Sequence, residues 1–450
     1  MDFTEAMKYI EEKNKLGQRP GLERIKELLL RLGNPQDKVK CLHIAGTNGK
    51  GSIFAFMQDV LMEAGYSVGR YISPTIFTYL ERFQINGTYI DEAVFAGALT
   101  RVAEQVKGME KDGYMSPTAF EIETAVAFVL FLEAKVDFFL VECGMGGLMD
   151  GTNVISNPYM TVMAQISRDH MQFLGDTLSE IAYQKAGIIK QNGMCVCASQ
   201  ADEVKAVIKK ICEEKNTSLY CVNHSDINIV HMDIDGSRFL YKGQEYFISM
   251  PGDFQIINAA TAIEAALQIG INSDMIRKAI AGTKWLGRFT VVRKNPYVIV
   301  DGAHNEAAWL SLKNSLHKYF TNQKFIYIIG VLRDKEYQKM VDIMHETMKY
   351  AVTVTPKGAR GLENTVLSEL ITVKGVETVT ADNNSDAMEK ALAKASEDDV
   401  IVVCGSLSFI GEYVMPKGGV QRSWEDTLGR GSVRSMECDM DIRHIRGWDT

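Results

Sequence analysis

The feature that most constrains this 450-residue chain is an apolar run that breaks into a glycine-rich loop and then becomes helical. Cys41–Ala45 has the character of a buried strand, the loop Gly46–Ser52 holds three glycines and a lysine, and apolar residues follow at helical spacing from Ile53. A strand, glycine loop and helix in this order wrap backbone N–H groups around phosphates and direct a helix N-terminus at them. The segment therefore predicts an α/β fold that holds a nucleoside triphosphate.

The loop departs from the general phosphate-loop pattern at two positions. That pattern has a glycine where this chain has Ile44, and a serine or threonine where Gly51 follows Lys50. A tight strand-to-helix turn with a solvated lysine is therefore the alternative. Because three glycines exceed what such a turn needs, we expect Lys50 to reach the β- and γ-phosphates, and Ser52 to contact the phosphates or their magnesium ion.

The bulk composition excludes several classes of partner. A net charge of −8 argues against general affinity for nucleic acid or an acidic membrane, and 46% hydrophobic with 24% charged residues is typical of a soluble globular protein. We find no apolar run that approaches a membrane span and no signal peptide at the N-terminus. The eight cysteines are scattered and lack zinc-finger spacing, so we expect a reducing cytoplasm.

Strand and helix signals alternate over most of the chain, and at roughly 150 residues per domain the length predicts two or three domains. Residues 1–293 are expected to form a P-loop-type, mostly parallel sheet with helices, with a small β-rich subregion at 227–250. A charged, proline-containing segment, Val291–Pro296, is expected to separate the domains, and a second α/β rhythm begins near Tyr297. Residues 294–415 are therefore expected to form a smaller, Rossmann-like α/β domain. Residues 416–450 lose apolar periodicity, and we expect a disordered tail.

Polar side chains follow two further apolar strands. Glu142 ends the strand Val136–Glu142, and glycines come directly after it. A carboxylate at the carboxyl end of a parallel strand faces the ligand crevice and suits a magnesium ion, although Glu142 could instead cap a loop donor. His170 follows the strand Met160–Ile166. It could ligate a metal, orient Asp169 or serve the fold alone.

The remaining candidates are weaker when each is taken alone. Lys185 lies near the end of an expected helix over 177–189, where a lysine is usually only a favourable charge beside the negative helix end. Asp301 follows the strand that opens the second domain, where it could accept hydrogen bonds from a ribose or cap the next helix. His304 could sit over the phosphates, and Arg288 lies close to the domain junction.

Several short motifs occur together along the chain in a fixed order. They are Gly46–Ser52, Ser73-Pro74, Glu81-Arg82, Phe120-Glu121, Glu142 with Gly144–Gly147, Asp150 with Thr152-Asn153, Asp169-His170, Lys185–Gly187, Asn258–Thr261, Gly287–Phe289, Asp301–Asn305, Asp334-Lys335 and Gly405-Ser406. In this order they resemble the folylpolyglutamate synthase family, often bifunctional with dihydrofolate synthase, of the Mur ligase superfamily. The resemblance covers roughly residues 1–414 and has no counterpart for the tail.

The resemblance implies a role for each of these groups. ATP would be held by Asn48, Gly49, Lys50, Gly51, Ser52, Asn258, Arg288, Asp301 and His304, and magnesium by Ser73, Glu142 and His170. Lys50, His170, Lys185 and Arg288 would be catalytic. Lys185 matches a lysine that CO₂ carboxylates, giving an anionic carbamate that supports a second metal ion. The pterin part of the substrate would contact Thr118, Ala119, Phe120, Glu121 and the loop Met149-Asp150-Gly151.

The resemblance implies an ATP-dependent ligase that adds L-glutamate to the γ-carboxylate of folate. ATP would convert that poor acyl donor into an acyl phosphate, which the amine of glutamate attacks, and two domains would close over the cleft to exclude water. We expect a monomer with no nucleic-acid or membrane partner. Dihydrofolate synthase activity on dihydropteroate is the alternative, alone or as a second activity.

Two departures bear on the substrate. Leu148 stands where bifunctional members often have an arginine, and Thr75 follows Ser73-Pro74 in place of a histidine. They favour folate elongation over dihydropteroate. A cell-wall amino-acid ligase is disfavoured because its lysine is usually followed by two threonines. A non-catalytic nucleotide-binding paralogue would have lost a magnesium ligand or Lys185, and neither is lost.

Overall fold

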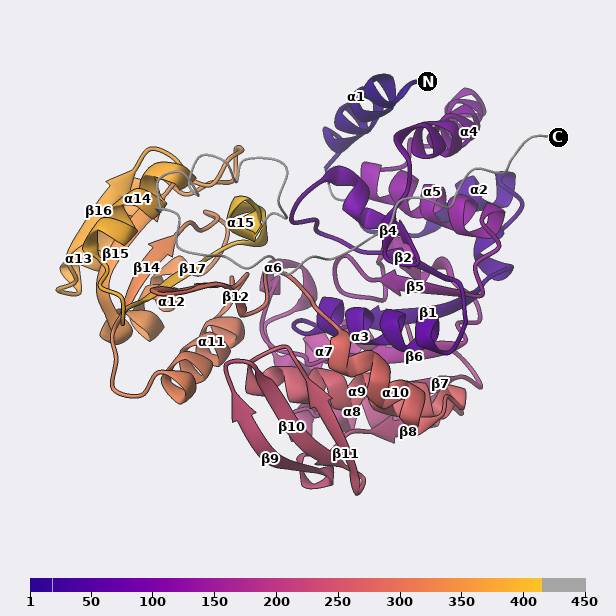
Figure 1. Ribbon diagram of the computed structural model, residues 1–450. Helices are drawn as coiled ribbons and strands as arrows, with labels where there is room; N and C mark the ends of the chain where they lie inside the picture. Colours follow the sequence, from indigo (N-terminus) through magenta and orange to yellow (C-terminus); the bar gives the residue numbers. More distant parts are fainter. Residues whose placement is uncertain (18, 415–450) are drawn as a thin grey trace, which may run out of the picture. The chain divides into compact units, whose positions relative to one another are not determined.

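The computed structural model describes residues 1–17 and 19–414 (Figure 1). The predicted disordered segment 416–450 lies outside the described residues. Two sheets and one small three-stranded sheet organise the described part of the chain. No described helix is long and apolar enough to cross a membrane.

The first sheet has eight strands and is mostly parallel, which confirms the expected class. Its order is β4 (Thr88–Tyr89), β3 (Phe83–Ile85), β2 (Val68–Tyr71), β5 (Phe138–Glu142), β1 (Lys40–Ala45), β6 (Met160–Met163), β7 (Met194–Cys197) and β8 (Ser218–Cys221). The six strands from β2 to β8 pair in parallel, and the β3–β4 hairpin adds an antiparallel edge. Parallel pairing places the carboxyl ends of β1, β5 and β6 side by side.

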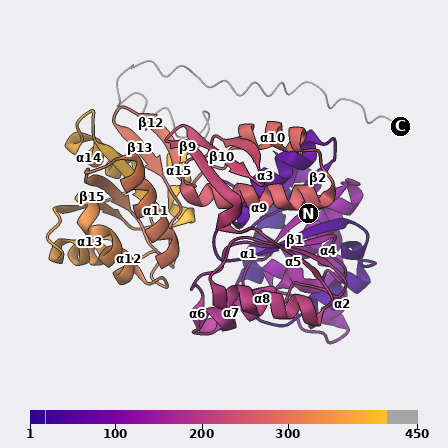
Figure 2. The same cartoon turned by 90° about the horizontal axis from the view of Figure 1, so that it is seen from below.

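Helices cover both faces of the first sheet, as its nearly continuous apolar strands require. Along β1, Leu42 and Ile44 pack into one core, whereas Cys41 and Ala45 pack into cores on the opposite face. One face carries α3 (Lys50–Glu63), α9 (Asp253–Ile269) and α10 (Ser273–Gly282), and the other carries α7 (Leu178–Ala186) and α8 (Asp202–Glu214) (Figure 2). The second face also packs against α1 (Phe3–Asn14), α2 (Glu23–Arg31), α4 (Glu92–Lys111) and α5 (Ala119–Glu133).

The expected β-rich subregion is also confirmed. It is an antiparallel sheet of β9 (Ile227–Asp233), β10 (Gly236–Tyr241) and β11 (Gln244–Ile248). Phe239, Tyr241 and Tyr246 point into the core shared with α3 and α9, which anchors the small sheet.

The second sheet is mixed and supports the expected C-terminal α/β domain. Its order is β12 (Thr290–Lys294), β13 (Tyr297–Val300), β17 (Val400–Cys404), β14 (Phe325–Ile329), β15 (Met348–Val354) and β16 (Thr378–Ala381). The helices α11 (Glu306–Tyr319), α12 (Tyr337–Met344), α13 (Asn364–Val373), α14 (Asn384–Lys394) and α15 (Leu407–Val414) belong to the same region. All pairs are parallel except β12–β13.

The segment expected to separate the two domains is itself a strand. β12 pairs with β13 and so joins the second sheet, and the half-buried Val291 packs against the core of that sheet. The division of the chain at residue 293 stays a prediction.

Candidate active site

One cavity of about 950 Å³ lies at the carboxyl ends of the central strands. Every residue for which the sequence predicted a role in ATP, magnesium or substrate binding lines it. These are Asn48, Gly49, Lys50, Gly51, Ser52, Ser73, Thr118, Ala119, Phe120, Glu121, Glu142, Met149, Asp150, Gly151, His170, Lys185, Asn258, Arg288, Asp301 and His304. The volume suits a substrate of the size of a nucleotide or a folate.

The glycines of the loop after β1 are required by close packing. Gly49 has a φ of 89°, and a Cβ there would lie 2.3 Å from Asn258 Oδ1. A Cβ at Gly51 would lie 2.9 Å from the Trp285 ring. The tryptophan therefore explains why this chain has glycine where the general pattern has serine or threonine.

Polar groups of the loop point inward and are only partly satisfied. Lys50 Nζ donates to the carbonyl oxygens of Gly46 and Thr47 at 3.2 and 3.3 Å, and lies 3.6 Å from Glu142 Oε1. Ser52 Oγ is buried and has no hydrogen-bond partner. A buried hydroxyl without a partner is costly, so Ser52, which lines the cavity, has an unused hydrogen-bonding capacity.

Glu142 is the buried carboxylate of the site. Burial raises its pKa, while the charges of Lys50 and Arg288 and the backbone N–H of Ser73 oppose that rise. Among the described residues no three His, Cys, Asp or Glu side chains converge as a preformed metal site. Ser73, Glu142 and His170 nevertheless line the same cavity.

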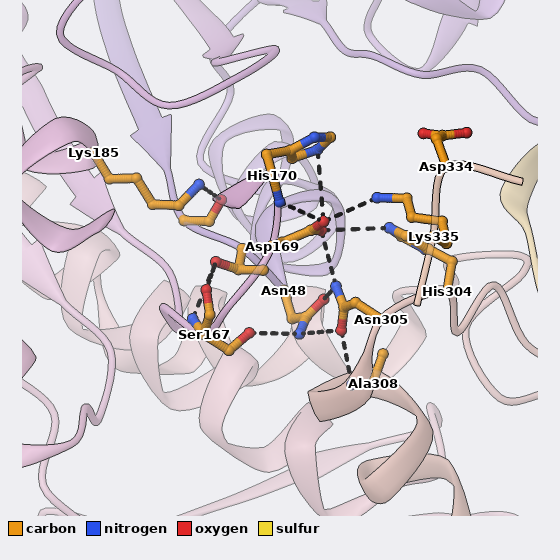
Figure 3. Close-up of polar contacts among 12 residues, drawn as sticks. Asn48, Ser167, Asp169, His170, Lys185, His304, Asn305, Ala308, Asp334 and Lys335 are labelled. Atoms are coloured by element: carbon orange, nitrogen blue, oxygen red, sulfur yellow. Dashed lines mark hydrogen bonds and ion pairs between the residues drawn. The ribbon is translucent and has the colours of Figure 1, made fainter. Parts of the chain in front are cut away.

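Asp169 is the centre of a polar cluster that joins the two sheets (Figure 3). Lys335 Nζ lies 2.9 Å from Asp169 Oδ1, and the Nε2 atoms of His170 and His304 each lie 3.9 Å from its oxygens. Burial alone would raise the pKa of Asp169, but Lys335 and the two histidines outweigh it and lower the pKa. The carboxylate therefore stays ionised and binds groups from both regions.

Two asparagines extend this cluster into the nucleotide loop. Asn48 and Asn305 exchange hydrogen bonds at 3.3 Å in each direction. Asn305 Nδ2 also donates to Asp169 Oδ2 at 3.1 Å, and its Oδ1 caps α11 by accepting from the Ala308 N–H at 3.0 Å. The start of α11 is thus fastened to the loop that precedes α3.

Lys185 is buried rather than solvated, although it lies in the last turn of α7 as expected. Its side chain is 4% exposed, and Nζ donates to the Gly46 carbonyl oxygen at 3.0 Å. Burial, helped by the nearby Lys50 charge, lowers its pKa to about 7. A buried amine of this kind is neutral in a large fraction of molecules at neutral pH.

Three predicted residues come from the beginning of the second sheet. Asp301 accepts from the Phe289 and Ala303 N–H groups, both at 2.7 Å, and does not cap α11, since Asn305 does. Burial lowers the pKa of Arg288, and the charges of Asp301 and Glu142 oppose that shift. His304 Nδ1 lies 2.7 Å from the Gly302 oxygen, and burial together with Lys335 lowers its pKa to about 4.

The predicted pterin segments form another part of the cavity wall. Thr118 caps α5 and binds Glu121, whose Oε2 also pairs with Arg24 while Oε1 has no partner. The Phe120 ring lies so close to Gly144 that a Cβ there would be 2.7 Å from the ring. Asp150 is buried, and its carboxylate accepts hydrogen bonds from the loop backbone.

Sequence reasoning gave no role to Lys335 or Asn305, and treated Asp169 only as a partner of His170. Asp169 and Asn305 do carry a signal, because both are polar residues that follow parallel strands. Asn305 also precedes a helix, where asparagine is a preferred cap. For Lys335 no local pattern predicts a partner 166 residues away.

The comparisons with known proteins identify the class. Residues 44–266 match the Mur ligase middle domain, and residues 287–407 match the Mur ligase glutamate ligase domain. The chain is thus a Mur ligase by both fold and domain composition.

Individual relatives narrow the class. The chain is 33% identical to "Dihydrofolate synthase/folylpolyglutamate synthase" of Bacillus subtilis, over 91% of this chain and 98% of that protein. The Mycobacterium tuberculosis folylpolyglutamate synthase, solved with ADP and AMPPCP, superposes with a TM-score of 0.83 at 28% identity, covering 92% of this chain and 98% of that one. The E. coli FolC structure with DHPP and ADP gives 0.81 at 27% identity, covering 94% and 98%. The chain belongs to the folylpolyglutamate synthase/dihydrofolate synthase family.

Proposed function

We propose that this protein is an ATP-dependent ligase that joins L-glutamate to the γ-carboxylate of a folate, preferably tetrahydrofolate. The observation that carries the proposal is that one cavity is lined by the nucleotide loop, the predicted pterin segments and the first residues of the second sheet. A ligase of this kind has to hold a phosphoryl donor, the carboxylate that becomes the acyl donor, and the attacking amine in one place.

The proposed nucleotide site uses the loop after β1. The solved M. tuberculosis relative holds ADP and AMPPCP, and E. coli FolC holds ADP. In this chain the N-terminus of α3 and the Lys50 ammonium would bind the β- and γ-phosphates, with backbone N–H groups supplied by Asn48–Ser52. Asn258, Arg288, Asp301 and His304 would contact the rest of the nucleotide.

Magnesium fits the donors that face the phosphates. Ser73 and Glu142 supply oxygen, which is the ligand type that Mg²⁺ prefers, and Ser52 Oγ is buried without a partner. The backbone N–H of Ser73 donates a hydrogen bond to the Glu142 carboxylate, so the two residues lie close together in space. Ser73, Glu142 and His170 would hold the first ion, and Mg²⁺ supplies charge neutralisation of the transferred phosphoryl group.

Lys185 is the proposed site of carboxylation by CO₂. CO₂ reacts with an uncharged amine, and the lowered pKa of Lys185 provides that form at neutral pH. The neutral amine would add to CO₂ and release a proton, which leaves an anionic carbamate close to the loop carbonyl of Gly46 as a ligand for a second magnesium ion.

The acyl transfer would then proceed in two stages. The γ-carboxylate attacks the terminal phosphorus of ATP, the bond from that phosphorus to the β-phosphate oxygen breaks, and ADP leaves. The product is an acyl phosphate, and Lys50 and Arg288 would spread the charge that develops during the transfer. The amine of L-glutamate attacks the acyl carbon, and phosphate leaves. Lys335 and His304, held beside Asp169, form the side of the cavity supplied by the second sheet.

A second candidate is dihydrofolate synthase activity, in which glutamate is joined to dihydropteroate. The B. subtilis relative is named for both activities, and Leu148 and Thr75 are the two departures that favour folate in this chain. The monomeric state and the cytoplasmic location expected from the sequence stay predictions.

ADP release measured with a panel of acceptors tests the proposal. Tetrahydrofolate, dihydropteroate and a muramyl nucleotide would each be supplied with L-glutamate, ATP and Mg²⁺. We expect turnover with tetrahydrofolate, and turnover with dihydropteroate would add the second activity. Turnover with the muramyl nucleotide alone, or with none of the three, would refute the proposal.

A further inference from the structure

A buried network of hydrogen bonds lies next to the cavity, and two of its members, His43 and Thr152, have none of the roles described above. It joins His43 of β1, Thr152 of the 3-10 turn Gly151–Val154, and Asp150. His43 is fully buried. The network therefore connects the strand that leads into the nucleotide loop with the loop that precedes Thr152.

The direction of each hydrogen bond follows from what the groups can donate. Thr152 Oγ1 lies 2.5 Å from Asp150 Oδ1, and a carboxylate only accepts, so the threonine proton points to Asp150. Thr152 Oγ1 also lies 2.8 Å from His43 Nε2, which must then be the donor. His43 Nδ1 has no partner, and burial, with a contribution from Lys190, lowers the histidine pKa to about 3. The histidine is thus a neutral donor through Nε2.

Asp150 connects the network to the backbone of the loop Gly144–Asp150. Its Oδ2 accepts from the Met145 N–H at 2.8 Å, and its Oδ1 accepts from the Thr152 N–H at 2.9 Å. At the other side the Leu148 N–H donates to the Gln184 oxygen at 2.7 Å, next to Lys185. Residues of this loop line the cavity, and Gly144 lies directly against the Phe120 ring, so the conformation of the loop shapes the substrate side of the site.

We propose that His43 and Thr152 are positioning residues, which hold Asp150 and thereby fix the loop Gly144–Asp150 for binding of the folate substrate. The kinetic part of this inference rests on the proposed function. The structural part does not, since it concerns hydrogen bonds between residues of the chain.

The test compares variants that differ by one hydroxyl or one donor. Thr152→Val removes the hydroxyl at nearly constant volume, whereas Thr152→Ser keeps it. His43→Leu removes the donor, and His43→Gln carries an amide N–H at the reach of Nε2. Thr353→Val is the matched control, because Thr353 is also fully buried and its hydroxyl binds the Asn364 carbonyl oxygen, at a distance from the loop.

Two readouts separate positioning from folding. Hydrogen exchange should speed up at the Met145 and Thr152 amides in Thr152→Val and His43→Leu, but not in Thr152→Ser, His43→Gln or Thr353→Val. The KM for folate should rise about tenfold or more in Thr152→Val and His43→Leu. Each of these variants loses one of the hydrogen bonds that run from His43 through Thr152 to the charged carboxylate of Asp150. The KM for ATP should stay within about twofold.

The outcomes are distinguishable. Unchanged exchange in Thr152→Val overturns the network, and faster exchange with an unchanged folate KM, or an equal rise in both KM values, overturns its role in substrate positioning. If the unaltered enzyme ligates neither folate nor dihydropteroate, the proposed function fails, while the exchange comparison still decides whether His43 and Thr152 support the loop.

Discussion

Removal of CO₂ should reversibly inactivate this enzyme through Lys185. Burial lowers the pKa of this amine to about 7 from an ordinary value of 10.5. At pH 7 about half of the Lys185 amines are then neutral, against roughly one in 3,000 for an unperturbed lysine. The reactive form is thus enriched by about three orders of magnitude. When the pH is lower than the pKa of Lys185 in the folded protein, the neutral fraction of the amine decreases. The rate of recovery should therefore fall about tenfold for each pH unit under 7 and level off above about pH 8.

The assay follows ADP release after CO₂ has been removed by degassing under argon. Addition of bicarbonate should restore turnover, and the rate of recovery, measured between pH 6 and 9, should have its midpoint near pH 7. Carbon-13 NMR with labelled bicarbonate should show one carbamate signal. Lys190→Met is the matched control, because burial also lowers the pKa of Lys190, to about 8, and its Nζ lies 3.3 Å from the Asn153 oxygen.

Lys185→Arg separates carboxylation from simple positive charge. Arginine keeps a cation near the Gly46 carbonyl but forms no carbamate, so turnover should fall at least about 100-fold, as when one charge-stabilising group is lost. Full activity of Lys185→Arg would refute the reasoning. So would activity that is indifferent to CO₂, or a carbamate signal that persists in Lys185→Arg and disappears in Lys190→Met.

The nucleotide loop and the Asp169 cluster support three further predictions. Lys50→Ala should lower turnover about 100-fold or more, because the developing phosphoryl charge loses its cation; normal ADP release would contradict the loop assignment. Gly51→Ala should raise the KM for ATP, because the added Cβ would lie 2.9 Å from the Trp285 ring. The double variant with Trp285→Leu should recover most of the loss if that contact is the cause. Lys335→Met should destabilise the fold by about 2–4 kcal/mol near pH 7, measured by urea denaturation, since a buried carboxylate loses its cation. Because Lys335 lowers the pKa of Asp169, this stabilisation is present above the unfolded pKa near 3.8 and is lost as pH falls below it, so the difference between variant and parent should shrink below about pH 4.

Local sequence patterns predicted much of the fold and the main parts of the cavity. Apolar runs and helical spacing located β1, β5 and α3, because each of these elements is determined by its own residues and by burial on the sheet. Because the carboxyl ends of parallel strands lie at the same edge of a sheet, the sequence alone predicts that Lys50 and Glu142 are close together. In the structure, Lys50 Nζ lies 3.6 Å from Glu142 Oε1.

Long-range packing accounts for what the sequence did not predict. Lys185 looks like an ordinary last-turn lysine until the loop after β1 is placed against it. Trp285 restricts Gly51 although more than 200 residues separate them, and no local pattern reports that contact.

The Gly46 carbonyl explains why the nucleotide loop and Lys185 have to be considered together. It accepts from Lys50 Nζ at 3.2 Å and from Lys185 Nζ at 3.0 Å, so two amines converge on one oxygen. Lys50 has to be a cation to bind phosphates, and its charge helps burial to lower the pKa of Lys185. The position of Lys50 that allows the loop to bind ATP therefore also favours the neutral form of the Lys185 amine beside it. A chain that kept the loop but moved Lys185 into water would lose the property on which carboxylation depends.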